Sequence, residues 1–333
     1  GLAYMEDRLD ERADPRLPAL STLPAEDWAA LLEGFRAGGV AALRGVLRRM
    51  AGHCGVVLEA APAQALPPAG FCAEWPASDG TRPVVPIIFY RSMRLAEDMA
   101  PVTALAEALA AQGVAPVPIF VASLKEPHSV TFLRAELPRL NPALIVSCTA
   151  FAEGQGQPLL AASGVPVIQA VIATTARAAW EGGARGLGAA DLAMHVVLPE
   201  LDGRVLGGAI GFKDVAPSAP ELGFTRQINC AEPDRVAQLA ARILALLRLR
   251  ATPSAARRLA VLLPDYPGAG GRAGYAVGLD VPSSVLALLE DLRAAGYDTG
   301  TAPATPRALL DALAEPRAAW PVAEYASAPD EAW

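Results

Sequence analysis

Cationic, hydroxyl and carboxylate side chains follow four short apolar runs of this sequence. They are Arg91, Ser92 and Arg94 after the first run, Ser123, Lys125 and His128 after the second, Thr149, Glu153 and Gln155 after the third, and Thr174, Thr175 and Arg177 after the fourth. A ligand that carries several carboxylates or phosphates suits such a set. The alternative is a set of ordinary solvated loop residues. The sequence predicts five substrate-binding residues: Arg91, Arg94, Lys125, Thr149 and Arg177.

These side chains can share one edge only if the apolar runs form a single parallel sheet. The runs cover 84–90, 118–121, 143–147 and 165–171, and they alternate with segments of helical periodicity. Strands that are apolar throughout and separated by amphipathic helices indicate a sheet covered on both faces. We therefore predict an α/β fold with a parallel, flavodoxin- or Rossmann-like doubly wound sheet. Ligands of such sheets bind beyond the carboxyl ends of the strands.

The periodicity divides the chain into three regions. Residues 1–80 form a helical N-terminal segment and connector, with helices over 27–50 that break near Gly38 and Gly39. Residues 81–252 form the α/β domain, with further strands over 192–198 and 205–212 and a helix over 234–249. Residues 253–333 start a second α/β domain with a strand over 258–263 and a helix over 283–295. We expect this last region to be incomplete, because it holds too little for a sheet core of its own.

A metal site around His195 is a weaker possibility. Asp191, Met194 and His195 would share one face of a helix, with Glu200 and Asp202 close behind. The apolar run LAMHVVL favours a strand, which would direct Met194 and His195 to opposite faces. A structural histidine is therefore the favoured interpretation of His195, and its role as a metal ligand is the alternative.

The glycine-rich stretch 264–280 lies between a predicted strand and a predicted helix. Its Gly271, Arg272 and Gly274 are candidates for a loop that cradles an anion. The stretch does not match a dinucleotide fingerprint, and no GxxxxGK[ST] motif occurs in the chain. We therefore do not expect this chain to bind ATP directly.

Composition narrows the class of protein further. The net charge of −7 argues against a nucleic acid as partner. No run of about 18 apolar residues and no charged, apolar leader occurs, so we expect a cytoplasmic protein without a membrane partner. The four cysteines lack CxxC spacing, which favours free thiols over a zinc site or a disulfide framework.

Several segments together resemble the large subunit of cobaltochelatase (CobN type), which is related to the large subunit of magnesium chelatase. They are PVVPIIFYRS, PIFVASLKEP, PVIQAVIATTARAAW, GLGAADLAMHVVLPELDGRV, AIGFKD and RRLAVLLPDYPGAGGRAGYAVGLDVPSSVLALLEDLRAAGYD. The last is the most specific, because GLD-x-P-x-S before a leucine-rich helix is unusual. The chain departs from the family at Ala269, Gly270 and Gly271, where polar or charged residues are usual, and in its shorter length.

The resemblance implies a part of the corrin-binding subunit of an ATP-dependent cobaltochelatase, a ligase of cobalamin biosynthesis. Such an enzyme inserts Co2+, its substrate ion, into hydrogenobyrinic acid a,c-diamide. Separate AAA+ ATPase subunits use ATP with Mg2+, and this chain alone is expected to be inactive. Glu153, Glu200 and Asp202 are the candidates to contact the metal or accept pyrrolic protons. Two alternatives are a non-catalytic α/β ligand-binding or scaffolding module that docks partner subunits, and a nucleotide-dependent transferase.

Overall fold

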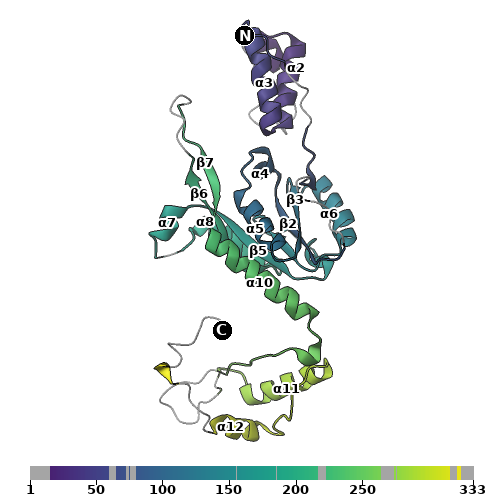
Figure 1. Cartoon of the computed structure of the whole chain (residues 1–333), viewed down its shortest axis with the longest axis vertical. Coiled ribbons are helices and arrows are strands. Elements are labelled where there is room, and N and C mark those ends of the chain that lie inside the picture. Colours follow the sequence, from purple (N-terminus) through teal and green to yellow (C-terminus); the bar gives the residue numbers. More distant parts are fainter. Residues whose placement is uncertain are drawn as a thin grey trace. The chain divides into compact units, whose positions relative to one another are not determined.

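The chain folds into two compact units, residues 1–247 and 248–333, and each is described here by itself. The computed structural model (Figure 1) describes residues 16–59, 65–72, 75, 80–154, 156–184, 186–216, 223–263, 274, 276–315 and 321–323. The three-region division 1–80, 81–252 and 253–333 stays a prediction. Within the described residues, no helix has both the length and the apolar content needed to cross a membrane.

The first unit is built on a seven-stranded, mostly parallel sheet with the order β1-β3-β2-β4-β5-β6-β7. The strands are β1 Ala69–Phe71, β2 Val84–Tyr90, β3 Ala115–Val121, β4 Ile145–Ser147, β5 Val167–Ala176, β6 Val205–Val215 and β7 Gln227–Ala231. Strands β2 to β6 pair in parallel, whereas β1 and β7 are antiparallel edge strands. All four predicted core strands are present, and β3 and β5 are longer than predicted.

Helices cover both faces of the sheet (Figure 1). Helices α5 (Ala100–Ala110) and α10 (Pro233–Ala251) bury Leu105, Leu109, Leu239 and Ile243 in one apolar cluster with β2 and β5. Helix α6 (Pro127–Leu140) packs its leucines into a second cluster. The predicted α/β fold is confirmed, but the antiparallel edge strands make the sheet mostly parallel rather than wholly parallel.

Helices precede and interrupt this sheet. The N-terminal helices are α1 Arg16–Leu20, α2 Ala25–Ala37 and α3 Gly39–His53, and short helices α4 Arg91–Leu95 and α7 Arg177–Glu181 directly follow β2 and β5. The break between α2 and α3 falls where it was predicted. Gly38 and Gly39 have φ angles of +64° and +79°, which a residue with a Cβ adopts at a cost.

The strand predicted over 192–198 is wrong. This segment is helical, with α8 Ala189–Leu192, a π-helical turn η2 Ala193–Val197 and α9 Leu198–Glu200. A continuous apolar run does not by itself distinguish a strand from a helix. Asp191 and His195 are buried while Leu192 and Val197 are exposed, so burial here follows helical spacing rather than alternation.

The second unit contains α11 (Val281–Ala294), α12 (Pro306–Ala314) and a short 3-10 turn, η4 (Ser254–Ala256). The helix predicted over 283–295 is confirmed, but the strand predicted over 258–263 is wrong. Those residues belong to no strand or helix, and Leu262 is 91% exposed. An apolar segment becomes a strand only when a neighbour pairs with its backbone, and no described segment of this unit does so.

Candidate functional site

A buried arginine, Arg204, organises a polar cluster at the carboxyl end of β4. Its side chain is 1% exposed. Nη1 donates to Ser147 Oγ at 3.1 Å, to Gln169 Oε1 at 3.2 Å and to Thr149 Oγ1 at 3.3 Å. Gln169 Nε2 in turn donates to the Thr149 carbonyl at 2.9 Å. The guanidinium thus ties the carboxyl end of β4 to the first residues of β5 and to the start of β6.

Two carboxylates complete this cluster from the other side. Arg204 Nη2 lies 2.9 Å from Asp202 Oδ2 and 3.4 Å from Glu153 Oε1. Asp202 also accepts from the Glu153 amide at 2.8 Å, and Glu153 accepts from the Leu159 amide. Burial raises the pKa of Glu153, although the charge of Arg204 opposes that shift. Thr149, Glu153 and Asp202, each predicted as a site residue, are therefore brought together.

Tyr90 links this cluster to the neighbouring strand β2. Its hydroxyl accepts from the Ala150 amide at 3.0 Å and donates to the Ala150 carbonyl at 3.2 Å. Burial raises the pKa of the Tyr90 phenol. Between β2 and β4 the strand order reverses, since the chain goes from β2 to β3 on one side and then to β4 on the other. Open α/β sheets bind ligands at such a point.

A second buried pair, Asp191 and His195, lies beside the end of β5. Asp191 accepts from the amides of Thr174 and Thr175 at 2.9 and 2.8 Å and also from both hydroxyls. Burial alone would raise the pKa of Asp191, but these four hydrogen bonds outweigh it and lower the pKa. His195 Nε2 lies 3.9 Å from Asp191 Oδ1. Burial lowers the pKa of His195, against the opposing effect of Asp191.

A cleft of about 400 Å3 connects the two groups of residues. It is lined by Gln169, His195 and Arg204, by the exposed Glu200, and by Val205 and Leu206 at the start of β6. Glu200 is thus the predicted catalytic candidate that reaches solvent, whereas Glu153 and Asp202 hold Arg204 in place. Across the described part of the chain, no group of three His, Cys, Asp or Glu side chains could hold a metal. His195 as a metal ligand stays a prediction.

The predicted cationic side chains have separate surroundings. Arg91 donates to the backbone carbonyls of Leu66 and Pro67, and burial lowers its pKa. Lys125 is exposed in the loop after β3, and Arg94 is half-buried in α4. They all follow carboxyl ends of strands, as predicted, but only Thr149 of the five substrate-binding candidates belongs to the Arg204 cluster. Their contact with a ligand stays a prediction.

Arg177 is engaged by carboxylates rather than left open to an anion. Its guanidinium pairs with Glu232 at 2.5 Å and with Glu181 at 2.7 Å, and these partners raise its pKa. Of the predicted glycine-rich loop, Gly271 and Arg272 lie outside the described residues. Gly274 is described and has a φ angle of +67°.

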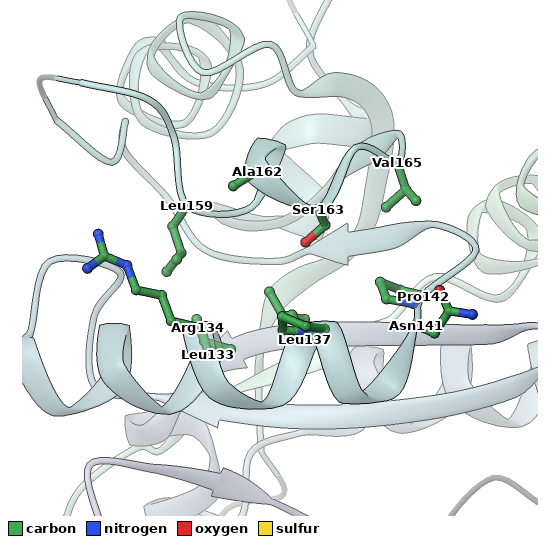
Figure 2. A pocket seen from close by; sticks show the side chains of 10 residues that line it. Leu133, Arg134, Leu137, Asn141, Pro142, Leu159, Ala162, Ser163 and Val165 are labelled. Atoms are coloured by element: carbon green, nitrogen blue, oxygen red, sulfur yellow. The ribbon is translucent and has the colours of Figure 1, made fainter.

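A separate groove lies between α6 and the 3-10 turn η1 (Ala161–Ser163), as Figure 2 shows. Its volume is about 290 Å3, and Leu133 and Leu137 of α6 face Leu159 and Val165 across it. Asn141 and Pro142, which precede β4, place this groove toward the amino ends of the strands. It shares no lining residue with the cleft beside Arg204.

Sequence reasoning missed the centre of the site. Arg204, Tyr90, Ser147 and Gln169 were not predicted as site residues, because each lies in or beside an apolar strand. A signal was present for Arg204, which stands between an Asp-Gly turn and the strand 205–212. A charged residue at the start of a buried strand needs a buried partner.

Comparison with known proteins identifies relatives over most of the chain. The family model described as CobN/Magnesium Chelatase matches residues 33–331. The chain is 37% identical to "Aerobic cobaltochelatase subunit CobN" of Pseudomonas aeruginosa over 91% of this chain and 26% of that protein. Its identity to a magnesium-chelatase subunit of Rhodobacter capsulatus is 27%, over 68% of this chain and 20% of that protein.

A solved structure agrees with the sequence comparison. The "Catalytic Subunit of Cobaltochelatase from Mycobacterium tuberculosis" superposes with a TM-score of 0.75 and 29% identity, over 92% of this chain and 26% of that one. The chain therefore spans about a quarter of the length of the cobaltochelatase relatives it matches. A family model that matches nearly the whole sequence shows that this chain belongs to the CobN/magnesium chelatase family.

Proposed function

We propose that this chain is part of the large, corrin-binding subunit of an ATP-dependent cobaltochelatase. Its substrates are Co2+ and hydrogenobyrinic acid a,c-diamide, and the reaction belongs to cobalamin biosynthesis. The observation that carries the proposal is the 37% identity to a cobaltochelatase subunit over 91% of this chain, against 27% over 68% for a magnesium-chelatase subunit.

The geometry of the first unit supports binding of a large ligand with polar arms. The strand order reverses between β2 and β4, and open α/β sheets of the predicted flavodoxin or Rossmann type bind ligands at such a point. The buried polar cluster around Arg204 lies beside that point. Apolar side chains of the same stretch are exposed, among them Val197, Leu201, Val205 and Leu206. Exposed apolar residues next to fixed polar groups suit an apolar ring that carries polar substituents.

The residues of the site divide into two roles in this proposal. Glu153 and Asp202 are bound to Arg204 and position it. Glu200 is exposed at the rim of the cleft, so its carboxylate can reach a macrocycle and accept a pyrrolic proton as Co2+ enters. Lys125 and Arg94 lie in segments that follow carboxyl ends of strands, where they can contact peripheral carboxylates.

ATP hydrolysis is assigned to separate AAA+ subunits that use Mg2+. The absence of a GxxxxGK[ST] motif from the sequence supports this division of labour. The purified chain should show no ATPase activity without such partners. Measurable turnover by the chain alone would contradict the assignment.

Binding of the macrocycle can be tested directly. The purified chain is titrated with hydrogenobyrinic acid a,c-diamide while the corrinoid absorption band is followed. We expect Lys125→Ala to weaken binding and Arg139→Ala to leave it unchanged. Helix α6 runs from the carboxyl edge of the sheet at Pro127 to the amino edge at Leu140, so Arg139 is a cation at the opposite edge.

The outcome separates this proposal from a scaffolding role. A saturable spectral change that depends on Lys125 supports a corrin-binding subunit. An unchanged spectrum at high ligand concentration would favour a non-catalytic module that docks partner subunits. Equal weakening by both variants would show a nonspecific charge effect rather than a site at the carboxyl edge.

A further inference from the structure

An aromatic side chain is exposed beside the point where the strand order of the sheet reverses. Phe151 lies in the loop that follows the carboxyl end of β4, and the residue is 46% exposed. Among the described residues, no second ring and no cation stacks on its ring. This edge is where open α/β sheets bind ligands. The ring of Phe151 is therefore open to a ligand at this edge.

The backbone of Phe151 adopts a left-handed conformation, with a φ angle of +65°. A bulky residue rarely adopts this conformation, and backbone strain of this kind clusters at functional sites. Among the described residues, the two other non-glycine residues with a positive φ are Glu97 and Asn141, which follow the ends of helices α4 and α6. Left-handed residues commonly end helices. Phe151 follows a strand, so helix termination does not account for its conformation.

Three hydrogen bonds fix the chain at Phe151. The Tyr90 hydroxyl accepts from the Ala150 amide at 3.0 Å and donates to the Ala150 carbonyl at 3.2 Å. The Phe151 amide donates to the Met194 carbonyl at 2.7 Å. The loop is therefore attached to β2 on one side and to the helical segment 189–200 on the other. Because the backbone that carries the ring is already held, a ligand that contacts the ring loses less binding energy to ordering.

A second exposed apolar residue lies in the element to which Phe151 is bonded. Val197 is 56% exposed and belongs to the same π-helical turn η2 as Met194. A conjugated macrocycle has a flat apolar face, and an aromatic ring packs well against such a π system. We propose that Phe151 contacts the conjugated face of the bound corrin macrocycle and contributes to its affinity. This inference rests on the proposed function and adds to it the residue that meets the ring.

Exchanging the side chain tests the inference. Phe151→Tyr keeps an aromatic ring and should bind hydrogenobyrinic acid a,c-diamide with the wild-type affinity, measured by titration of the corrinoid absorption band. Phe151→Leu keeps an apolar side chain without a ring and should bind about threefold to tenfold more weakly, as expected for the loss of one aromatic contact. Thermal unfolding shows whether each variant is folded.

Phe224 provides the matched control. It is 62% exposed and precedes β7, the edge strand that is three places away from β4 in the sheet. Phe224→Leu makes the same chemical change to an exposed phenylalanine away from the reversal of strand order. It should leave the affinity for the macrocycle unchanged.

A second measurement keeps the wild-type backbone and ring position. The chain is labelled with fluorophenylalanine at its eight phenylalanines, and the Phe151→Tyr and Phe224→Leu variants assign two of the 19F resonances. On saturation with the macrocycle, the resonance of Phe151 should shift and that of Phe224 should stay in place. This result does not depend on whether Phe151→Leu folds.

The outcomes distinguish this inference from the proposed function. Equal affinity of the wild type and folded Phe151→Leu, or a stationary Phe151 resonance at saturation, would overturn the inference while macrocycle binding still supports the chelatase role. Equal weakening by Phe151→Leu and Phe224→Leu would show a nonspecific apolar association and would also overturn it. Absence of macrocycle binding by the wild-type chain would overturn both proposals.

Discussion

Replacing Arg204 should destabilise the first unit far more than replacing an exposed arginine. Arg204→Met keeps much of the side-chain volume but removes the charge that faces Asp202 and Glu153. Their side chains are 3% and 7% exposed, so neither carboxylate gains enough water to compensate. The oxygens of Ser147 and Gln169 also lose a donor.

The expected magnitude follows from this burial. Removing one partner of a buried ion pair costs about 3–5 kcal/mol. A unit of this size loses about 2–4 °C in Tm per kcal/mol, so the expected decrease is about 6–20 °C. Arg139→Met is the matched control, because the Arg139 side chain is 76% exposed and pairs with the neighbouring Glu136 at 3.2 Å. Its change should stay within about 1 kcal/mol.

The loss should also depend on pH with a definite sign. Burial raises the pKa of Glu153, and the charge of Arg204 opposes that shift. Without Arg204 the folded-state pKa rises further above the unfolded value, so the folded state holds a proton that the unfolded state releases. Stability then falls as pH rises through that interval, and the deficit should be larger at about pH 8 than at about pH 5.

Urea denaturation of both variants at the two pH values tests this reasoning. Adding Asp202→Asn and Glu153→Gln to Arg204→Met should recover most of the lost stability, because no buried charge then lacks a partner. A loss below about 1 kcal/mol in Arg204→Met, or a loss with no dependence on pH, would refute the account of a buried ion network.

Three further predictions concern stability. Glu126→Ala removes the N-cap of α6 and should lower the free energy of unfolding, measured by urea denaturation, by about 0.5–2 kcal/mol. Burial alone would raise the pKa of Glu126, but hydrogen bonds from Ser129 and His128 lower that pKa to about 2. The stabilisation by Glu126 is therefore complete above the ordinary carboxyl pKa and is lost as pH falls through about 2. Asp191→Asn should cost about 1–3 kcal/mol at neutral pH, and the difference from wild type should shrink on acidification, since the folded-state pKa of Asp191 is lowered. Gly211→Ala should lower the free energy of unfolding by about 1–3 kcal/mol, because a Cβ would lie 2.5 Å from Pro101 Cγ. An unchanged denaturation midpoint for any of the three variants would contradict the contact described here for the replaced residue.

The core of the fold was predictable because its residues repeat a simple pattern. The run 84–90 is buried along almost its whole length, and the leucines of α6 fall on one face. Periodicity did not reveal the edge strands β1 and β7. Their residues are partly exposed and mixed in character, so pairing with a neighbour determines their structure rather than composition.

The site was predictable only in part, because position along a strand does not tell what a side chain contacts. Placing Thr149 and Glu153 after β4 was enough to bring them to the carboxyl edge. Nothing in the local sequence shows that Arg91 binds the connector or that Arg177 binds Glu232, which lies 55 residues away along the chain. Such pairings depend on the folded arrangement, and they decide which cations remain open to a ligand.

The helical geometry of 189–200 explains why one stretch supplies most of the residues that line the cleft beside Arg204. Helical spacing places Asp191 and His195 on the buried face, and the turn at Asp202 and Gly203 then reverses the chain so that Arg204 returns under it. Gly203 has a φ angle of +74°, which permits this tight reversal. His195 and Arg204 therefore belong to one contiguous segment, although they contact different strands. A change of length within that segment should alter the shape of the cleft while the strands β2 to β5 keep their pairing.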